Sequence, residues 1–351
     1  MSLPKSMKAA ILVELNKDLV VDEIEMPASL DFGQVLVRVH YSGICGSQLG
    51  EIRGVKGEDK FLPHLLGHEG SGIVQSIGPR VSRFKEGDHV VMHWRPSGGI
   101  QATNPIYSLE GKRVNAGLVT TFNEYAIVSE NRLTKIPDSY PLNQATLYGC
   151  AITTGFGVVE NNAKIKFGQS IVVVGAGGVG LNIIQAASMR NAFPIVAVDL
   201  FENRLDLAKK VGATHSVMSS NASEWSKNVE EILMKDKADI VVDNTGNTDV
   251  IRSCYNLTKD TGKTILVGVP KEGDETSLFT LPLHFGKEIT GSHGGDAAPE
   301  NDIPRYLELE KRGIFDTSNI ITEVYDLESI NEAIKSMEKG TLSGRCVIKL
   351  I

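Results

Sequence analysis

The sequence has few cysteines, no long hydrophobic run and no excess of basic residues. Its 351 residues include 4 Cys and carry 43 acidic against 36 basic side chains. Four scattered cysteines are too few for a disulfide framework in a chain of this size, so we expect reduced thiols. No stretch approaches the roughly 20 apolar residues that span a bilayer, and Lys and Arg form no blocks. We therefore expect neither a membrane partner nor a nucleic-acid partner.

Length and composition indicate two folded domains. One core rarely serves more than about 200 residues, so a chain of 351 residues favours two. The hydrophobic fraction of 41% excludes disorder, because enough apolar surface is available to offset the conformational entropy. Near the N-terminus the apolar run 9–13 ends at Glu14, short of the roughly 7–15 residues of a signal-peptide core. We therefore expect a cytoplasmic protein, with residues 1–6 as a short extension.

The first part of the chain has the pattern of a mainly β domain. Between residues 8 and 136 short β-like runs are separated by glycines, and no helical period comes between them. This spacing is typical of a barrel or a sandwich rather than a parallel sheet. The predicted strands are 9–13, 34–41, 71–77, 89–93 and 122–128.

From Ser170 onward strands and helices alternate. Continuous apolar runs alternate with segments of helical spacing, which predicts a doubly wound parallel sheet. The predicted strands are 171–174, 195–199, 238–243 and 264–268, and the predicted helices are 179–189 and 205–211. Two further helices, 303–311 and 327–338, and a strand, 345–351, follow.

A glycine motif connects the strand 171–174 to the next helix. In the segment Gly175-Ala-Gly177-Gly178-Val179-Gly180, the first glycine permits a tight turn and the last lets the helix lie close to the sheet. Gly177 would let the backbone approach a pyrophosphate, which the helix N-terminus at Gly178 and Val179 attracts. A generic glycine loop is the alternative, but the strand before and the helix after favour a dinucleotide site.

The choice of dinucleotide depends on the end of the strand 195–199. Asp199 follows Gly180 by 19 positions, and its carboxylate can accept hydrogen bonds from a ribose diol but repels a 2′-phosphate. NAD is therefore expected rather than NADP, although Arg204 nearby could accept a 2′-phosphate. The alternative role for Asp199 is that of a helix cap.

A second group of residues could hold a metal. Two thiols and an imidazole, from Cys45, His68 and Cys150, would leave the fourth zinc position open to substrate. Their separations of 23 and 82 residues match no local zinc motif, so buried free cysteines and a structural histidine are an equal alternative. An open zinc beside a nicotinamide would act as a Lewis acid that lowers the pKa of an alcohol. Glu69, next to His68, fits the acid that orients such a ligand.

At these residues the chain resembles the zinc-dependent alcohol dehydrogenases of the medium-chain dehydrogenase/reductase superfamily. The resemblance extends over essentially the whole chain. The matching segments are Gly43–Cys45, Gly67–Glu69, Gly87–Asp88, Cys150, 171–180, Asp199, 212–214, 291–295 and Arg345.

The resemblance implies an α/β fold in which a Rossmann domain is inserted into a GroES-like, mainly β catalytic domain. The implied boundaries are 1–151 and 294–351 for the catalytic domain and 152–293 for the Rossmann domain. Members of the superfamily pair through an edge strand of the Rossmann sheet, so a homodimer is expected, with a tetramer as the alternative.

The resemblance also implies roles for particular residues. Cys45, His68 and Cys150 would ligate one catalytic zinc, and Glu69 would be the acid at the metal. Ser47 occupies the position of the hydroxyl that passes the alcohol proton outward, and Arg345 that of an arginine at the cofactor pyrophosphate. Trp94 would line the substrate pocket, whereas a core aromatic is the alternative. The neighbouring His93 is expected to be a buried core histidine.

Three departures from the family pattern bear on function. Many members carry four closely spaced cysteines that bind a structural zinc, but residues 93–99 contain none, so we expect one zinc per chain. Gln48 replaces the aspartate usual beside the histidine ligand. Gly50 replaces the histidine that ends the proton relay in many alcohol dehydrogenases.

The sequence thus predicts a zinc-dependent oxidoreductase that transfers hydride between NAD and a primary or secondary alcohol, giving an aldehyde or ketone. One alternative is a zinc-free NADPH-dependent quinone or alkene reductase of the same superfamily, which would lack the Cys/His set. The other is a nucleotide-binding protein that has lost turnover, which Gln48 and Gly50 would favour.

Overall fold

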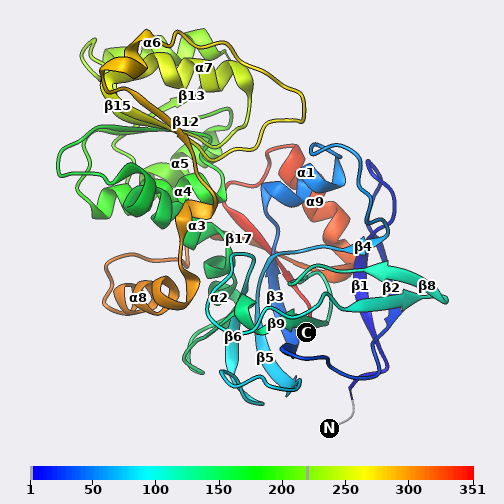
Figure 1. Cartoon of the computed structure of the whole chain (residues 1–351). Coiled ribbons are helices and arrows are strands. Elements are labelled where there is room, and N and C mark those ends of the chain that lie inside the picture. The colour runs from blue at the N-terminus through cyan, green and yellow to red at the C-terminus, as the bar shows by residue number, and fades with distance from the viewer. Residues whose placement is uncertain (1–2, 219–220) are drawn as a thin grey trace. The chain divides into compact units, whose positions relative to one another are not determined.

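The computed structural model describes residues 3–218 and 221–351. Two compact units are present (Figure 1): unit 1 comprises residues 1–150, 298–341 and 345–351, and unit 2 comprises 151–297 and 342–344. The short helix η5 (Gly294–Asp296) belongs to unit 2, a few residues beyond the expected boundary at 293. It does so because η3 (Val158–Ala163) holds it: Asn161 donates a hydrogen bond to the carbonyl of Gly295.

Unit 1 contains a closed β-barrel. Its strands are, in barrel order, β1 (Ser6–Leu12), β2 (Val20–Glu25), β7 (Ile106–Leu109), β8 (Lys112–Asn115) and β4 (His64–Leu65). Alternate residues of these strands point inward, as the period of two requires. The barrel core includes Met7, Ile11, Ile24, Leu65 and Tyr107.

The second sheet of unit 1 combines distant parts of the sequence. Its order is β10 (Leu133–Lys135), β6 (His89–His93), β5 (Glu69–Ile77), β3 (Gln34–Gly43), β18 (Arg345–Lys349) and β17 (Ile321–Asp326), with β9 (Tyr125–Ser129) also paired to β3. Strand β18 lies antiparallel to β3, so the C-terminal segment completes a sheet begun near the N-terminus. Valines of β3 and β9 pack in its core with Val90 and Met92.

Short helices surround these strands in unit 1. They are α1 (Gly46–Ile52), η1 (Glu130–Arg132), α2 (Leu142–Ala145), η2 (Thr146–Gly149), α8 (Pro299–Lys311), η6 (Leu327–Ser329) and α9 (Ile330–Glu338). Glu310 of α8 accepts hydrogen bonds from the hydroxyls of Tyr140 and Tyr148. These bonds attach α8 to η2, the helix that precedes Cys150.

Unit 2 is a parallel six-stranded sheet covered by helices on both faces (Figure 1). The strand order is β13 (His215–Met218), β12 (Ile195–Asp199), β11 (Ile171–Val174), β14 (Ala238–Asp243), β15 (Thr258–Leu266) and β16 (Glu288–Gly291). Helices α4 (Gly178–Met189) and α5 (Glu202–Lys210) cover one face, and α6 (Ala222–Ile232) and α7 (Thr248–Leu257) cover the other. Helices α3 (Ala151–Gly157) and η4 (Leu281–Phe285) complete the unit.

The predicted fold class, a doubly wound parallel sheet inserted in a mainly β domain, is confirmed.

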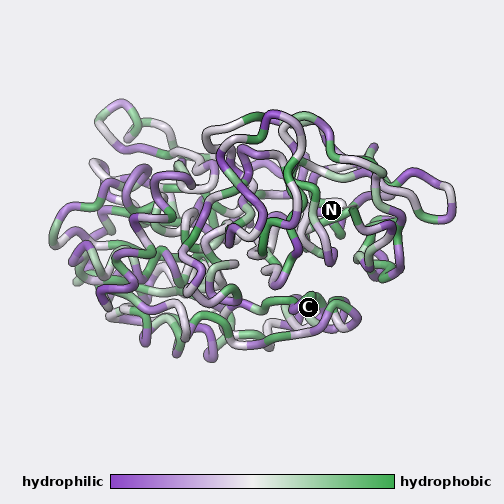
Figure 2. The backbone as a smooth tube through the Cα atoms, turned by 90° about the horizontal axis from the view of Figure 1, so that it is seen from below, coloured by the Kyte–Doolittle hydropathy of each residue, from purple (hydrophilic) through white to green (hydrophobic). Residues whose placement is uncertain are grey.

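Hydrophobic residues occur in short stretches along the backbone (Figure 2). Within residues 3–218 and 221–351, no helix has the length and apolar character to cross a membrane.

Candidate functional site

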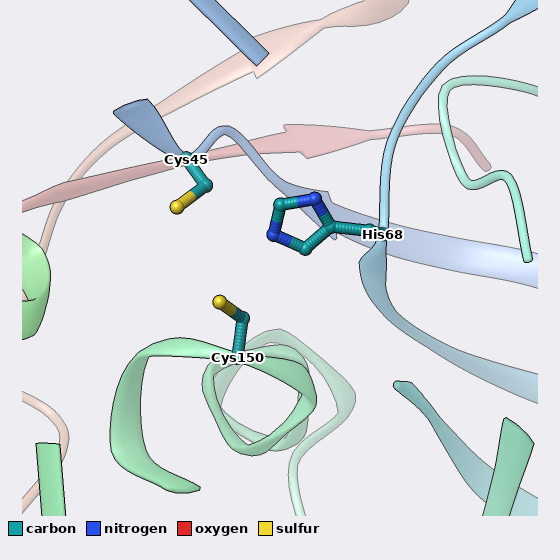
Figure 3. A group of neighbouring side chains, drawn as sticks. All are labelled: Cys45, His68 and Cys150. Atoms are coloured by element: carbon teal, nitrogen blue, oxygen red, sulfur yellow. The ribbon is translucent and has the colours of Figure 1, made fainter. Parts of the chain in front are cut away.

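Three potential metal ligands meet in unit 1. Cys45 precedes α1, His68 lies between β4 and β5, and Cys150 follows η2. The pairing of Ser42 with Gly70 brings the end of β3, and therefore Cys45, beside the start of β5 and His68. One ligand atom from each residue lies within 4.8 Å of the others (Figure 3).

The donor set suits a metal of intermediate softness such as zinc. In Figure 3 the ring nitrogen of His68 that lies farther from the backbone, Nε2, points toward the two sulfurs. This atom is buried and has no hydrogen-bond partner among the residues that the structure describes. A buried ring nitrogen without a partner is costly, and zinc bound to Nε2 would remove this cost, so the residues fit a zinc ion.

The surroundings favour a thiolate at Cys45. The side chain of Cys150 as hydrogen-bond partner lowers the pKa of the Cys45 thiol well below its ordinary value, against the effect of burial. The positive charge of Arg345 and the neighbouring His68 lower this pKa further. Because zinc binds the deprotonated thiol, this environment supports the assignment of Cys45 as a ligand.

Gln48 contacts two of the elements that form this group. It is the third residue of α1, and its Oε1 accepts a hydrogen bond from the backbone N–H of Cys45 at 3.0 Å. Its Nε2 contacts Nδ1 of His68, and the side chain is buried. Gln48 therefore lies against the ring of His68 and the backbone of Cys45.

Glu69 and Arg345 form a buried ion pair with each other. Arg345 also donates from Nη1 to the carbonyl of Ile44 at 2.9 Å, while its Nε has no partner within the described part of the chain. Glu69 follows His68 in the sequence, but one of its carboxylate oxygens is directed at Arg345. Arg345 thereby connects Glu69 to the backbone immediately before Cys45.

Ser47 lies on α1, two residues after Cys45. Its hydroxyl oxygen is buried and makes no hydrogen bond to any residue in the ranges 3–218 and 221–351. At Gly50, on the same helix, an added Cβ would lie 3.7 Å from the side chain of Val55.

Trp94 and His93 lie at the end of β6 and differ in their surroundings. The ring of Trp94 is partly buried and meets the ring of His68 edge-on, with 6.5 Å between the centroids. The guanidinium of Arg95 lies 5.9 Å from the centroid of the Trp94 ring. His93 is buried, and its two nitrogens contact the carbonyl of Arg95 and the hydroxyl of Thr134, as expected for a core histidine.

Glu130 has a role that the sequence does not indicate. This buried carboxylate in η1 accepts hydrogen bonds from the backbone N–H groups of Ser82, Arg83 and Ile100. Burial alone would raise the pKa of Glu130, but these donors outweigh it and lower the pKa. One side chain thus connects Ser82 and Arg83 to Ile100. A single acidic residue in a loop carries no signal that would have revealed this.

The glycine motif of unit 2 forms the tight turn between β11 and α4. Gly175 directly follows β11 and has a φ of +92°, which favours glycine, and a Cβ at Gly180 would lie 2.0 Å from the carbonyl oxygen of Gly175. At Gly177 a Cβ would meet no atom within 4 Å. Helix α4 begins at Gly178, so its first N–H groups, including that of Val179, form the positive end of the helix at this loop.

Asp199 and Arg204 lie close together at the end of β12. Oδ2 of Asp199 accepts a hydrogen bond from the N–H of Ala176 at 2.7 Å, inside the glycine loop. Nη1 of Arg204 lies 3.8 Å from Oδ1 of Asp199, and its guanidinium lies over the ring of Phe201. The acid and the arginine named from the sequence therefore share one region of unit 2.

Comparisons with known proteins agree with this geometry. Residues 31–138 match the model of the alcohol dehydrogenase GroES-like domain, and residues 178–312 match that of the zinc-binding dehydrogenases. Alcohol dehydrogenase 1 of Trifolium repens is 31% identical over 98% of this chain and 97% of its own. The chain belongs to the zinc-dependent alcohol dehydrogenase family.

Two further members of the family illustrate its range. The S-(hydroxymethyl)glutathione dehydrogenase of Komagataella pastoris is 31% identical over 95% of both chains. The crystal structure of benzyl alcohol dehydrogenase from Acinetobacter calcoaceticus is similar with a TM-score of 0.88 at 29% identity, covering 99% of this chain and all of that one.

Proposed function

We propose that this protein is a zinc-dependent oxidoreductase that transfers hydride between a primary or secondary alcohol and NAD, giving an aldehyde or ketone. The observation that carries the proposal is the meeting of Cys45, His68 and Cys150, with Nε2 of His68 buried and directed at the sulfurs. Three such ligands hold zinc with one position open to substrate. The activities in the names of its relatives support alcohol oxidation.

Each residue near the metal has a proposed task. Zinc bound here would supply Lewis acidity, which lowers the pKa of a substrate hydroxyl. The hydroxyl of Ser47, buried without a partner in the described residues, would accept the proton that the substrate loses and pass its own proton on to water. Trp94 would line the substrate pocket, because its ring already contacts that of His68. Glu69 would act on the metal site through its position beside His68.

Unit 2 would bind the cofactor. We assign the pyrophosphate to the loop from Gly175 through Gly177 to Gly180 and the ribose to Asp199, which favours NAD over NADP. Arg204 would approach the same ribose, and Arg345, whose Nε has no partner within the described residues, would approach the pyrophosphate. This assignment makes residues 152–293 the cofactor domain and residues 1–151 and 294–351 the catalytic domain, which the division of the chain into two units supports.

Metal analysis with an activity assay on the same samples tests the proposal. We expect about one zinc per chain, NADH formation with an alcohol, loss of activity on chelation and recovery with Zn²⁺. Cys150→Ser should lose the metal, whereas Cys254→Ser should retain it, because Cys254 is buried in α7. If the purified protein contains no zinc, the result would favour the NADPH-dependent reductase. If it binds zinc and NAD but oxidises no alcohol, the result would favour a protein that only binds its nucleotide.

We further propose a homodimer formed through the sheet edge of unit 2, and a cytoplasmic location, where four free cysteines stay reduced. Strand β16 ends the six-stranded sheet and leaves one edge of its backbone for another strand. Large apolar side chains are exposed in the segment that leads to this strand: Val269, Phe279, Leu281 and Phe285. Such exposed apolar groups beside an edge strand are typical of a subunit interface.

A further inference from the structure

The carboxamide of Gln48 contacts a backbone N–H group at one end and a histidine ring nitrogen at the other. Its Oε1 accepts the backbone N–H of Cys45, and its Nε2 contacts Nδ1 of His68. An amide has one accepting end and one donating end. In this arrangement Nε2 donates to Nδ1, so the ring proton of a neutral His68 is on Nε2.

A zinc ion requires the opposite tautomer. Nε2 of His68 points toward the sulfurs of Cys45 and Cys150 (Figure 3), so it is the atom that would bind zinc through its lone pair. A neutral imidazole that binds through Nε2 carries its proton on Nδ1 and needs an acceptor there. The group that Gln48 presents to Nδ1 is its NH₂, which is a donor.

Rotation of the amide does not resolve this conflict. Turning the carboxamide by half a turn would offer Oε1 to Nδ1 of His68, but it would also place the NH₂ against the N–H of Cys45. This N–H is the one that Gln48, as the third residue of α1, satisfies at the start of the helix. With the carboxamide in this place, its two ends face different partners, so its single oxygen reaches either the N–H of Cys45 or Nδ1 of His68, but not both. The two oxygens of a carboxylate could serve both.

We propose that Gln48 is a positioning residue that makes zinc binding compete with the capping of α1, and that it thereby weakens zinc affinity relative to a carboxylate at this position. The proposal rests on the zinc site of the proposed function. Loading the site transfers the hydrogen bond of Gln48 from Cys45 N–H to His68 Nδ1. Changes in such partners of metal ligands shift metal affinity by about 10–100-fold.

The first experiment measures the zinc dissociation constant of the full chain by competition with a chromophoric chelator. Gln48→Glu retains the side-chain length and supplies two accepting oxygens, so we expect zinc to bind about 10-fold tighter or more. Gln75→Glu is the matched control, because it makes the same charge change on a partly buried glutamine of β5. It should leave the dissociation constant unchanged. Equal or weaker binding by folded Gln48→Glu would overturn the proposal.

A second measurement uses the unaltered protein and does not depend on the folding of a variant. With ¹⁵N-labelled histidine, assigned by comparison with His68→Ala, the proton of His68 should move from Nε2 to Nδ1 on zinc loading. The amide hydrogen of Cys45 should then exchange faster with solvent. If the amide hydrogen of Cys45 exchanged at the same rate with and without zinc, the transfer of the hydrogen bond would be contradicted.

The two proposals fail in different ways. If neither the unaltered chain nor Gln48→Glu binds zinc, the proposed zinc-dependent function is wrong. If both bind zinc with the same affinity, the zinc site stands and only the role of Gln48 is wrong. If Gln48→Glu binds zinc tightly and the unaltered chain binds it only weakly, the result supports both the zinc site and the role of Gln48.

Discussion

Glu69 and Arg345 form an ion pair that is buried on both sides, although 276 residues separate them in the sequence. The pair connects β5 to β18, and Arg345 also holds the carbonyl of Ile44 immediately before Cys45. A residue of the C-terminal segment therefore fixes the backbone immediately before Cys45, the first of the proposed metal ligands.

Removal of one partner should leave an uncompensated buried charge. We expect Arg345→Met to lower the free energy of unfolding by about 3–5 kcal/mol. Urea denaturation monitored by circular dichroism measures this loss. The double variant Glu69→Gln with Arg345→Met should recover most of it, because no charge then remains unpaired. A double variant as unstable as the single one would show that packing, and not charge, determines the effect.

His93 should make stability depend on pH. Burial, with the nearby charge of Arg132 adding to it, lowers the pKa of His93 from 6.5 to about 4. Above pH 6.5 the imidazole is neutral in both the folded and the unfolded chain. Between pH 6.5 and 4 the unfolded chain binds a proton that the folded chain does not, so stability falls by about 3 kcal/mol.

His93→Gln, which cannot titrate, is the comparison for this prediction. Unfolding free energies measured from pH 7.5 to 4 should fall less steeply for the variant than for the unaltered chain. If the unfolding free energies of the two proteins fell equally with pH, His93 would not be the group that makes stability depend on pH.

Asp199 should control the choice between NAD and NADP. Asp199→Ser removes the charge that repels a 2′-phosphate while Arg204 remains beside it. The ratio of kcat/KM for NADH to that for NADPH should fall about 10-fold or more, since one repulsion of about 1–4 kcal/mol is lost. The control is Asp206→Ser, because this exposed residue of α5 pairs with Lys209. A ratio that changes equally in both variants would exclude a specific role for Asp199.

The subunit interface can be tested at Phe285, which is exposed in the segment leading to β16. Phe285→Glu places a charge where the proposed dimer buries an aromatic ring, so the dimer should dissociate at micromolar concentration. Analytical ultracentrifugation measures the change in mass. Phe167→Glu makes the same substitution at another exposed position of unit 2 and should leave the mass unchanged. A monomeric unaltered chain would contradict the dimer itself.

Local sequence patterns predict unit 2 better than unit 1. Strands β11 and β12 were predicted at their observed bounds because buried parallel strands are continuous apolar runs. The hairpin of β7 and β8 was not predicted, since Lys112 and Arg113 obscure its short alternation. Helix α1 contains two glycines and has no apolar stripe, so its sequence carries no helical signal.

The candidate metal site depends on contacts that no local pattern contains. Spacing alone left Cys45, His68 and Cys150 as ligands or as ordinary buried residues, and the family resemblance made the difference. Strand pairing at Ser42 and Gly70 brings two of them together. The contact of Gln48 with both His68 and Cys45 is visible only once the chain is folded.

The position of β18 has a consequence for the order in which the protein matures. On the ribosome β18 is made after the whole of residues 151–297, so the parallel sheet can form while β3 still lacks one neighbour. Until Arg345 emerges, Glu69 has no cation to pair with, and the backbone at Ile44 lacks its anchor. The nascent chain can therefore fold residues 151–297 first, and the surroundings of Cys45 are complete only after Arg345 has emerged.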